Sequence, residues 1–339
     1  TLAMSWTEWA RHDAVSLANL VRKGEPARGS ALEDELARVK RKFIDEGLVA
    51  AGTERARYWG WPNVYTYTKS IGEQMLSSSG LRYAIVRPSV IECSVAYPFS
   101  GWNEGISTMA PLIFMILKGH IQVGEGEKTN LDVIPVDYVS AGMIIALAAL
   151  RANKGKEVYH LGVSDVNPVA MRRIIELTGL YKRKHFLAKG TGNPLLNQVL
   201  AHIEPVGLTP DRFYAHGALA IAKAARSLSG LIKQAGVGPL ASIAAPVSKG
   251  LKSYANIAQR AGLIWELFLP FMGETEYYFQ TGHIRALYAS MSDRERALLP
   301  WHPEDIDWRH YLLDVQFPGL EKWVNPGIEE KLNRPQKPL

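Results

Sequence analysis

The feature that most constrains the fold is a helical pattern followed at once by a short run of branched apolar residues, because this order recurs along the first half of the chain. Residues 64–78 have helical spacing, and the run LRYAIVRPSVIECS follows them. LDVIP at residues 131–135 precedes a helical pattern that starts near Asp137, and EVYHLGV at residues 157–163 precedes another. Short apolar strands that alternate with helices are typical of a parallel sheet covered by helices. The sequence therefore predicts an α/β fold.

Turn and cap residues set the expected boundaries of the helices. Asn63 suits the cap of a helix from Val64 to Ser78, which Gly80 ends. Apolar spacing predicts a surface helix over residues 31–49 and an apolar helix over residues 109–118. Beyond residue 180 the strand pattern fades and alanine-rich helical sequence follows. We therefore expect two domains, residues 1–180 and residues 181–339.

Composition excludes several classes of protein. The single cysteine, Cys93, rules out an internal disulfide framework or a cysteine-based zinc site, and we expect it to be a small buried residue. The nine histidines show no spacing that predicts a metal site. The net charge of +6 comes without the dense basic stripe of a nucleic-acid-binding protein. No apolar run reaches the roughly 18 residues of a membrane span, so we expect a cytoplasmic protein.

One segment has an unusual charge. Between Asp211 and Glu266 the sequence contains no acidic residue. The basic residues of this segment are Arg212, Lys223, Arg226, Lys233, Lys249, Lys252 and Arg260. A solvated basic helix face is one interpretation, and contact of residues 212–265 with an anionic lipid surface or a phosphate-bearing substrate is the other. Peripheral membrane association is therefore one of the two hypotheses for this segment.

Tyr65 and Lys69 are candidate catalytic residues. They are four positions apart, so on a helix they share one face. A free tyrosine is a weak acid–base group at neutral pH, and a nearby ammonium group favours its deprotonated form. Tyr67 is two positions from Lys69 and is expected to point away. The spacing also arises by chance in a chain with 14 tyrosines, so it is not diagnostic alone.

Four stretches, in order, resemble the fatty acyl-CoA reductases, which are called male sterility proteins in plants and form a branch of the extended short-chain dehydrogenase/reductases. YTYTKSIGEQML resembles the Tyr-x-x-x-Lys helix of that family. IVRPSVIECSVAYPFSGWNEGI resembles the next strand and loop, including a Pro-x-x-Gly-Trp element at residues 98–102. LDVIPVDYVSAGMI resembles an Asp-x-Ile-Pro-Val-Asp segment, and IDWRHYLLDVQFPGLEKWV resembles an Asp-Trp-x-x-Tyr stretch. Residues 182–271 match only in general character.

The resemblance implies the reduction of a long-chain acyl-CoA by NADPH. A hydride passes to the thioester carbonyl, coenzyme A leaves, and the aldehyde takes a second hydride to become a fatty alcohol. Tyr65 would protonate the developing oxyanion, and Lys69 would also hold the nicotinamide ribose. Arg87, Pro88 and Ser89 would lie beside the nicotinamide as further cofactor-binding residues.

Two further positions have more than one interpretation. Gly101 and Trp102 either shape the entrance for the acyl chain or anchor an aromatic loop. Asp137 is expected to cap the following helix rather than to take part in the chemistry.

The phosphate-binding part of a nicotinamide site is missing from the sequence. Such a domain should begin with a strand, a Gly-x-x-Gly-x-x-Gly loop and a helix N-terminus that receives the pyrophosphate. No such loop occurs here, and only 64 residues precede Tyr65. We therefore expect a partial NAD(P)-binding Rossmann fold, the C-terminal half of an extended short-chain dehydrogenase/reductase, followed by a mainly helical region. On this view the chain alone neither binds NADPH well nor turns over substrate, and an open sheet edge favours association such as a homo-oligomer.

Two other functions stay open. A thioester reductase or sugar-nucleotide epimerase of the same superfamily would share the Tyr-x-x-x-Lys helix but not the stretch that begins with Asp307 and Trp308. A non-catalytic fragment could instead bind acyl chains or membrane through residues 212–265. A glycine-rich strand-loop-helix in the upstream genomic sequence would favour the reductase.

Overall fold

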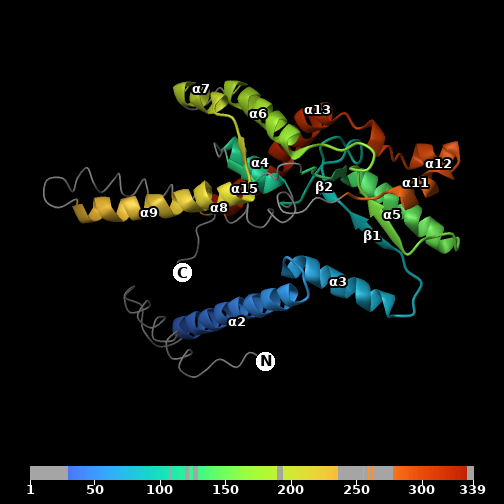
Figure 1. The fold of residues 1–339 in the computed structure, drawn as a ribbon, viewed down its shortest axis with the longest axis horizontal. Coiled ribbons are helices and arrows are strands. Elements are labelled where there is room, and N and C mark those ends of the chain that lie inside the picture. Colours follow the sequence, from blue (N-terminus) through green and yellow to red (C-terminus); the bar gives the residue numbers. More distant parts are fainter. Residues whose placement is uncertain are drawn as a thin grey trace. The chain divides into compact units, whose positions relative to one another are not determined.

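The computed structural model describes residues 30–106, 109–118, 122–124, 129–188, 194–235 and 278–333, together with the single positions 255, 259 and 262. The chain divides into two compact units, residues 1–81 and residues 82–339 (Figure 1). The domain boundary predicted near residue 180 does not coincide with this division. Helix α6, Met171–Ala188, passes through that position without a break. The division into residues 1–180 and 181–339 therefore remains a prediction.

The described residues of the first unit form two helices, α2 at Ser30–Tyr58 and α3 at Val64–Ser77. α2 is longer than predicted, because residues 50–58 are mostly good helix formers. It ends where Gly60 takes a φ of +79°. The N–H of Gly60 bonds to the carbonyl of Arg57 and that of Trp61 to the carbonyl of Ala56, both at 2.9 Å, which is a Schellman end.

The predicted cap of α3 is confirmed. The side-chain oxygen of Asn63 accepts a hydrogen bond of 2.9 Å from the N–H of Thr66. Gly80 lies just beyond the helix end at a φ of +71°, which a glycine adopts without strain. No residue of α3 is fully buried, and its side chains are either exposed or half-buried.

The described residues of the second unit contain three pairs of parallel strands. β1, Ile85–Pro88, pairs with β5, Val158–Leu161. β2, Val90–Glu92, pairs with β4, Val133–Pro135, and β3, Gln122–Gly124, pairs with β6, Val206–Leu208. At Ser89 the chain changes partner, because its N–H bonds to the carbonyl of Leu161 and the N–H of Val90 bonds to the carbonyl of Asp132. The predicted parallel α/β arrangement is confirmed for the first two pairs, and β6 is a strand beyond residue 180 that the sequence did not predict.

Helices make up most of the rest of the described second unit. They are α4 Ala110–Leu117, α5 Val136–Arg151, α6, α7 Pro194–His202, α8 Pro210–His216, α9 Ala218–Ala235, α11 Gly282–Ala289, α12 Asp293–Leu298, the 3₁₀ turn η2 Pro303–Asp305, α13 Trp308–His310, the π-helix η3 Tyr311–Gln316, α14 Phe317–Gly319, the π-helix η4 Leu320–Val324 and α15 Asn325–Asn333. α4, α5 and α6 lie where the sequence predicts helices.

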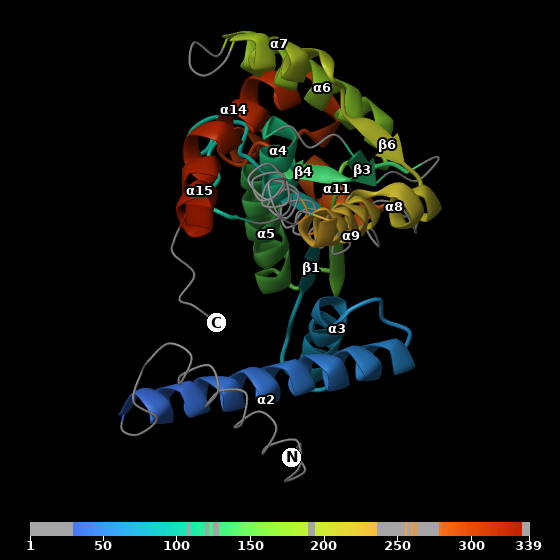
Figure 2. The same cartoon turned by 90° about the vertical axis from the view of Figure 1, so that its left-hand side faces the viewer.

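Two apolar cores hold the second unit. The first joins α4 and α6 to the C-terminal residues 311–328, and the second joins β4, β5, α5 and α11 around Trp301. α6 and α7 pack side by side, as Figure 2 shows. Within the described residues, none of the helices combines the length and the apolar character that a membrane span requires.

Candidate active site

Tyr65 and Lys69 lie on one face of α3, as their spacing predicts. The ammonium nitrogen of Lys69 lies 5.6 Å from the centre of the Tyr65 ring. The Tyr65 side chain is 66% exposed and Lys69 is also exposed, so a ligand can reach both. Tyr67 on the same helix is half-buried. The structure thus brings the two predicted catalytic residues together within the first unit.

Arg87, Pro88 and Ser89 lie at the carboxyl end of β1 in the second unit. Arg87 is exposed and Pro88 is half-buried. The hydroxyl oxygen of Ser89 is buried and has no hydrogen-bond partner in the described part of the chain. Arg87 and Pro88 end β1 and Ser89 follows them, whereas Tyr65 and Lys69 belong to the first unit.

Asp137 does not cap α5, so that prediction is wrong. The N-cap residue is Pro135, and Asp137 is the second residue of the helix. Its carboxylate instead accepts hydrogen bonds from the N–H groups of Val95, Ala96 and Tyr97, at 3.1, 2.9 and 3.2 Å. Three backbone donors on one carboxylate fix the loop that leaves β2. The spacing of residues gave no signal for this contact, because the loop is about 40 positions away.

Gly101 and Trp102 are held tightly in the same loop. Gly101 is buried at a φ of +81°, and a Cβ placed on it would lie 3.0 Å from the carbonyl oxygen of Val315 and 3.2 Å from the Cα of Gly319. The backbone N–H of the half-buried Trp102 donates to the carbonyl of Phe99, and its backbone carbonyl accepts from the N–H of Ser94. These contacts are those of a loop anchor, and the substrate role of both residues remains a proposal.

A buried polar network fastens this loop to the C-terminal helices, and the sequence did not predict it. The carboxylate of Glu92 accepts from the N–H of Met109 at 2.9 Å and from the side-chain amide of Gln316. The Gln316 oxygen accepts from the N–H of Cys93 at 2.9 Å, and the Tyr311 hydroxyl donates to the Cys93 carbonyl at 2.6 Å. Burial, with a smaller effect of the Glu92 charge, raises the pKa of the Cys93 thiol to about 12. The prediction that Cys93 is a small buried residue is confirmed.

The Asp-Trp-x-x-Tyr stretch explains how the C-terminal helices reach the network. Asp307 caps α13 by accepting from the N–H groups of Arg309 and His310. The indole N–H of Trp308 donates to Asn167, whose side-chain N–H₂ donates to the carbonyl of Ile306 at 2.8 Å. Tyr311 then points its hydroxyl at Cys93. Asp307, Trp308 and Tyr311 belong to the motif found in the sequence, but their role here is packing and positioning.

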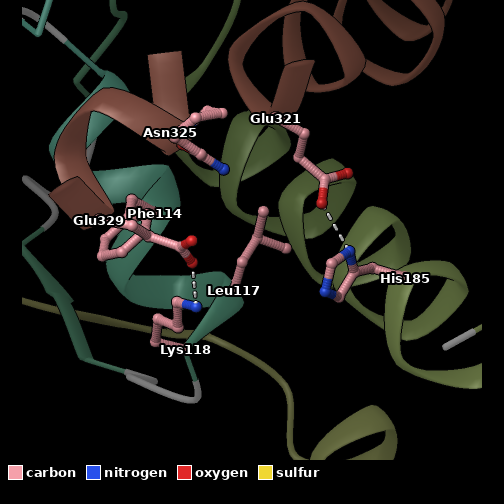
Figure 3. Close-up of a pocket in the computed structure, with 8 residues that line it drawn as sticks. Phe114, Leu117, Lys118, His185, Glu321, Asn325 and Glu329 are labelled. Carbon is pink, nitrogen blue, oxygen red and sulfur yellow. Dashed lines mark hydrogen bonds and ion pairs between the residues drawn. The ribbon is translucent and has the colours of Figure 1, made fainter. Parts of the chain in front are cut away.

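A pocket of about 170 Å³ lies elsewhere in the second unit, between α4, α6 and the C-terminal helices. It contains none of the predicted site residues. Figure 3 shows its two ion pairs: Lys118 meets Glu329 at 2.5 Å, and His185 meets Glu321 at 2.7 Å. Tyr181 also donates its hydroxyl to Glu321, and burial followed by this bond raises the pKa of Tyr181. The carboxylates of this pocket are thus turned toward partners within the protein.

Comparison with known proteins finds a family model that matches part of the chain, and relatives that match most of it. Residues 18–143 match a family of NAD-binding domains described as male sterility protein. A probable fatty acyl-CoA reductase of Arabidopsis thaliana is 28% identical over 291 residues, which are 83% of this chain and 56% of the relative. An alcohol-forming fatty acyl-CoA reductase of Simmondsia chinensis is 29% identical over 308 residues, which are 86% of this chain and 58% of the relative.

The parallel strands and the matched domain define an α/β protein of the NAD-binding class. Over residues 18–143 the chain is similar to the male sterility proteins, and the relatives that match most of its length are named fatty acyl-CoA reductases. The resemblance found in the sequence is therefore confirmed. The match at residues 18–143 includes the predicted catalytic and cofactor-binding residues as well as Gly101 and Trp102, but not the basic segment 212–265. The chain spans less than two thirds of the length of the two relatives, 56% and 58%.

Proposed function

We propose that this chain is the C-terminal part of the reductase region of an alcohol-forming fatty acyl-CoA reductase, which reduces a long-chain acyl-CoA to a fatty alcohol with NADPH. The family relationship supports the reaction, because the relatives are named for it. The observation that carries the proposal is the placement of Tyr65 and Lys69, exposed together on one face of α3 with 5.6 Å between the ammonium nitrogen and the ring centre.

In the proposed reaction, bound NADPH supplies a hydride to the acyl carbon in each of two reductions. The hydroxyl of Tyr65 donates a proton to the carbonyl oxygen as negative charge develops there. The first reduction forms a hemithioacetal; as its carbon–sulfur bond breaks, its hydroxyl group loses the proton, the sulfur takes up a proton, coenzyme A leaves as the thiol, and an aldehyde remains. In the second reduction the aldehyde takes a hydride and a proton and becomes the alcohol. Lys69 stabilises the tyrosinate that remains after proton transfer, until solvent restores the proton.

The residues present fit the nicotinamide end of the cofactor. A buried hydroxyl without a partner in the described residues, that of Ser89, is suited to bind a polar ligand group at the carboxyl end of β1. Arg87 and Pro88 are the last two residues of β1 and directly precede Ser89. The role of Lys69, in the first unit, as a ligand of the ribose is proposed from the family resemblance alone. The pyrophosphate would need a glycine-rich loop that this sequence does not contain. We therefore assign the partial Rossmann fold to residues 1–180 and a mainly helical substrate region to residues 181–339.

A second proposed property is peripheral contact with anionic lipid through residues 212–265, in a cytoplasmic protein that forms homo-oligomers. The support comes from α9, where Lys223, Arg226 and Leu228 are exposed while Ala222 and Ala225 are buried. Lys223 and Arg226 are three positions apart and share one helix face, and an exposed basic helix face suits an anionic lipid surface. A solvated basic face explains the same pattern, so a vesicle-binding assay decides between them. If the chain shows no preference for anionic vesicles, both the proposed lipid contact and the alternative of a non-catalytic membrane-binding fragment are wrong.

The test of the reductase is NADPH oxidation with hexadecanoyl-CoA, measured on this chain and on the full-length product of the gene that encodes it. We expect activity in the full-length product and neither turnover nor stoichiometric NADPH binding by the 339 residues alone. Tyr65→Phe should lower kcat by about 100-fold or more, the usual effect of removing a general acid. Tyr67→Phe on the same helix is the matched control and should retain activity.

Product analysis separates the related reactions. Hexadecanol as the end product supports the alcohol-forming enzyme, and accumulation of the aldehyde indicates a thioester reductase instead. A Tyr65→Phe variant as active as the wild type would show that the proposed acid is wrong.

A further inference from the structure

Two aromatic side chains from distant parts of the second unit meet at its surface. The rings of Phe99, in the loop after β2, and Trp323, in η4, lie with their centres 5.1 Å apart at an angle of 46°. Phe99 is 42% exposed and Trp323 is 44% exposed. A single exposed aromatic residue is ordinary on a protein surface. A contacting pair from two elements leaves a larger apolar surface in water, and we call these two residues the aromatic pair.

The backbone beneath the aromatic pair is fixed on both sides. Asp137 holds the N–H groups of residues 95–97, and the hydroxyl of Ser94 donates to the carbonyl of Phe99 at 2.6 Å. Gly101 and Gly319 bring the loop and the C-terminal helices into direct backbone contact, since a Cβ on Gly319 would lie 2.3 Å from the Gly101 oxygen. Ring positions fixed before binding reduce the entropy that a ligand must overcome. The aromatic pair is therefore preorganised.

The position and charge of the aromatic pair indicate what binds there. The loop leaves the carboxyl end of β2, and ligands of open α/β sheets bind outside the carboxyl ends of the strands. The ammonium nitrogen of Lys322 lies 4.5 Å from the centre of the Trp323 ring. The neighbouring Glu321 is directed toward His185, as Figure 3 shows. An apolar surface with a cation at its edge complements a ligand with an alkyl chain and an anionic head.

We propose that the aromatic pair is a binding subsite for the acyl chain of a long-chain acyl-CoA, with Lys322 placed toward the phosphate-bearing head. This inference rests on the proposed reductase function for its choice of ligand. Phe99 and Trp323 are then specificity residues that favour long chains over short ones. A fluid bilayer would not require two rings in fixed positions, so a soluble acyl chain is the occupant that the rigid loop favours.

The test is calorimetric titration of the 339-residue chain with hexadecanoyl-CoA below its micelle concentration, without NADPH, beside titrations with octanoyl-CoA and free coenzyme A. Phe99→Ala and Trp323→Ala should each weaken binding of hexadecanoyl-CoA about tenfold, because each removes an apolar contact of about 1.4 kcal/mol. Octanoyl-CoA should lose less, and coenzyme A should be unaffected. Trp59→Ala, which removes an exposed tryptophan beside Arg55 in the first unit, is the matched control and should bind normally.

Thermal unfolding of each variant shows whether it is folded. Lys322→Glu, at an exposed position, tests the proposed contact with the phosphate-bearing head independently of the two aromatic residues. It should weaken hexadecanoyl-CoA and coenzyme A alike. No binding of hexadecanoyl-CoA by the wild-type chain, or equal loss in the control, overturns the proposal. Loss of vesicle binding with acyl-CoA affinity unchanged assigns the aromatic pair to a lipid surface and also overturns it. Because no reduction is measured, these outcomes are distinct from failure of the Tyr65 test.

Discussion

The hydroxyl group of Tyr311 donates a hydrogen bond of 2.6 Å to the backbone carbonyl oxygen of Cys93, and this bond joins segments 218 positions apart. Both residues are buried, so the bond forms away from water. It attaches the first turn of η3 to the end of β2, at the start of the loop that carries Phe99, Gly101 and Trp102. The C-terminal helices are therefore part of the support of the proposed substrate loop.

Removing this hydroxyl should destabilise the second unit. Tyr311→Phe leaves the Cys93 carbonyl without that donor and should lower the free energy of unfolding by about 1–3 kcal/mol. Urea denaturation measures the change. Tyr278→Phe is the control, because the Tyr278 hydroxyl accepts an exposed hydrogen bond from the side-chain amide of Asn130, and the loss of this bond should have little effect. Equal stability of the two variants would contradict the structural role of Tyr311.

The glycine contact between the same two segments makes a separate prediction. Gly101→Ala should lower stability by about 1–3 kcal/mol, because the residue has a φ of +81° and its new Cβ would press on the backbone of Val315 and Gly319. Gly282→Ala, at a helix start with nothing within 4 Å of the added Cβ, should be neutral or slightly stabilising. A thermal melt compares them, and a Gly101→Ala protein as stable as wild type would show that the loop relaxes freely.

Local patterns were sufficient to predict the elements that carry the candidate site. Asn63 and Gly80 correctly indicated the two ends of α3, because capping depends on residues only a few positions apart. The apolar runs at residues 85–92 and 133–135 became parallel strands because buried strands need little more than branched apolar side chains. The face shared by Tyr65 and Lys69 follows from helix geometry alone.

Contacts between distant segments could not be predicted in this way. Asp137 was expected to cap its own helix, yet its carboxylate faces a loop about 40 positions earlier. Gln316 gives no sequence signal, because an amide that bridges Glu92 and Cys93 resembles any surface glutamine until the chain is folded. The hydrogen-bond partners of a polar group depend on tertiary packing, which neither the composition nor the hydrophobic periodicity of the sequence reveals.

The thiol of Cys93 should be inert in the folded protein. Its side chain is fully buried, and burial raises the pKa of Cys93 to about 12, so the reactive thiolate is scarce at pH 8. We expect no reaction with an aromatic disulfide reagent under native conditions and one equivalent of thiol after denaturation, since Cys93 is the single cysteine. Rapid stoichiometric labelling of the native chain would show that the network around β2 opens easily.

Lys182 on α6 should make stability depend on pH in the alkaline range. Its side chain is buried and its ammonium donates a hydrogen bond of 2.6 Å to the carbonyl of Ile203. Burial lowers the pKa of Lys182 below its ordinary value of 10.5, and Glu204 offsets part of this effect. Between the lowered pKa and 10.5 the unfolded chain therefore binds more protons than the folded one, so this group makes the free energy of unfolding rise with pH.

Lys182→Met should abolish that rise, because the substituted side chain holds no proton in either state. Lys184→Met, at an exposed position of the same helix, should keep it. Urea denaturation of the wild type and both variants at a series of pH values from neutral to about 10 measures the slope. Identical slopes in the Lys182→Met variant and the wild type would show that the ammonium group is solvated in the folded state, and that α6 and the end of α7 separate more readily than their packing implies.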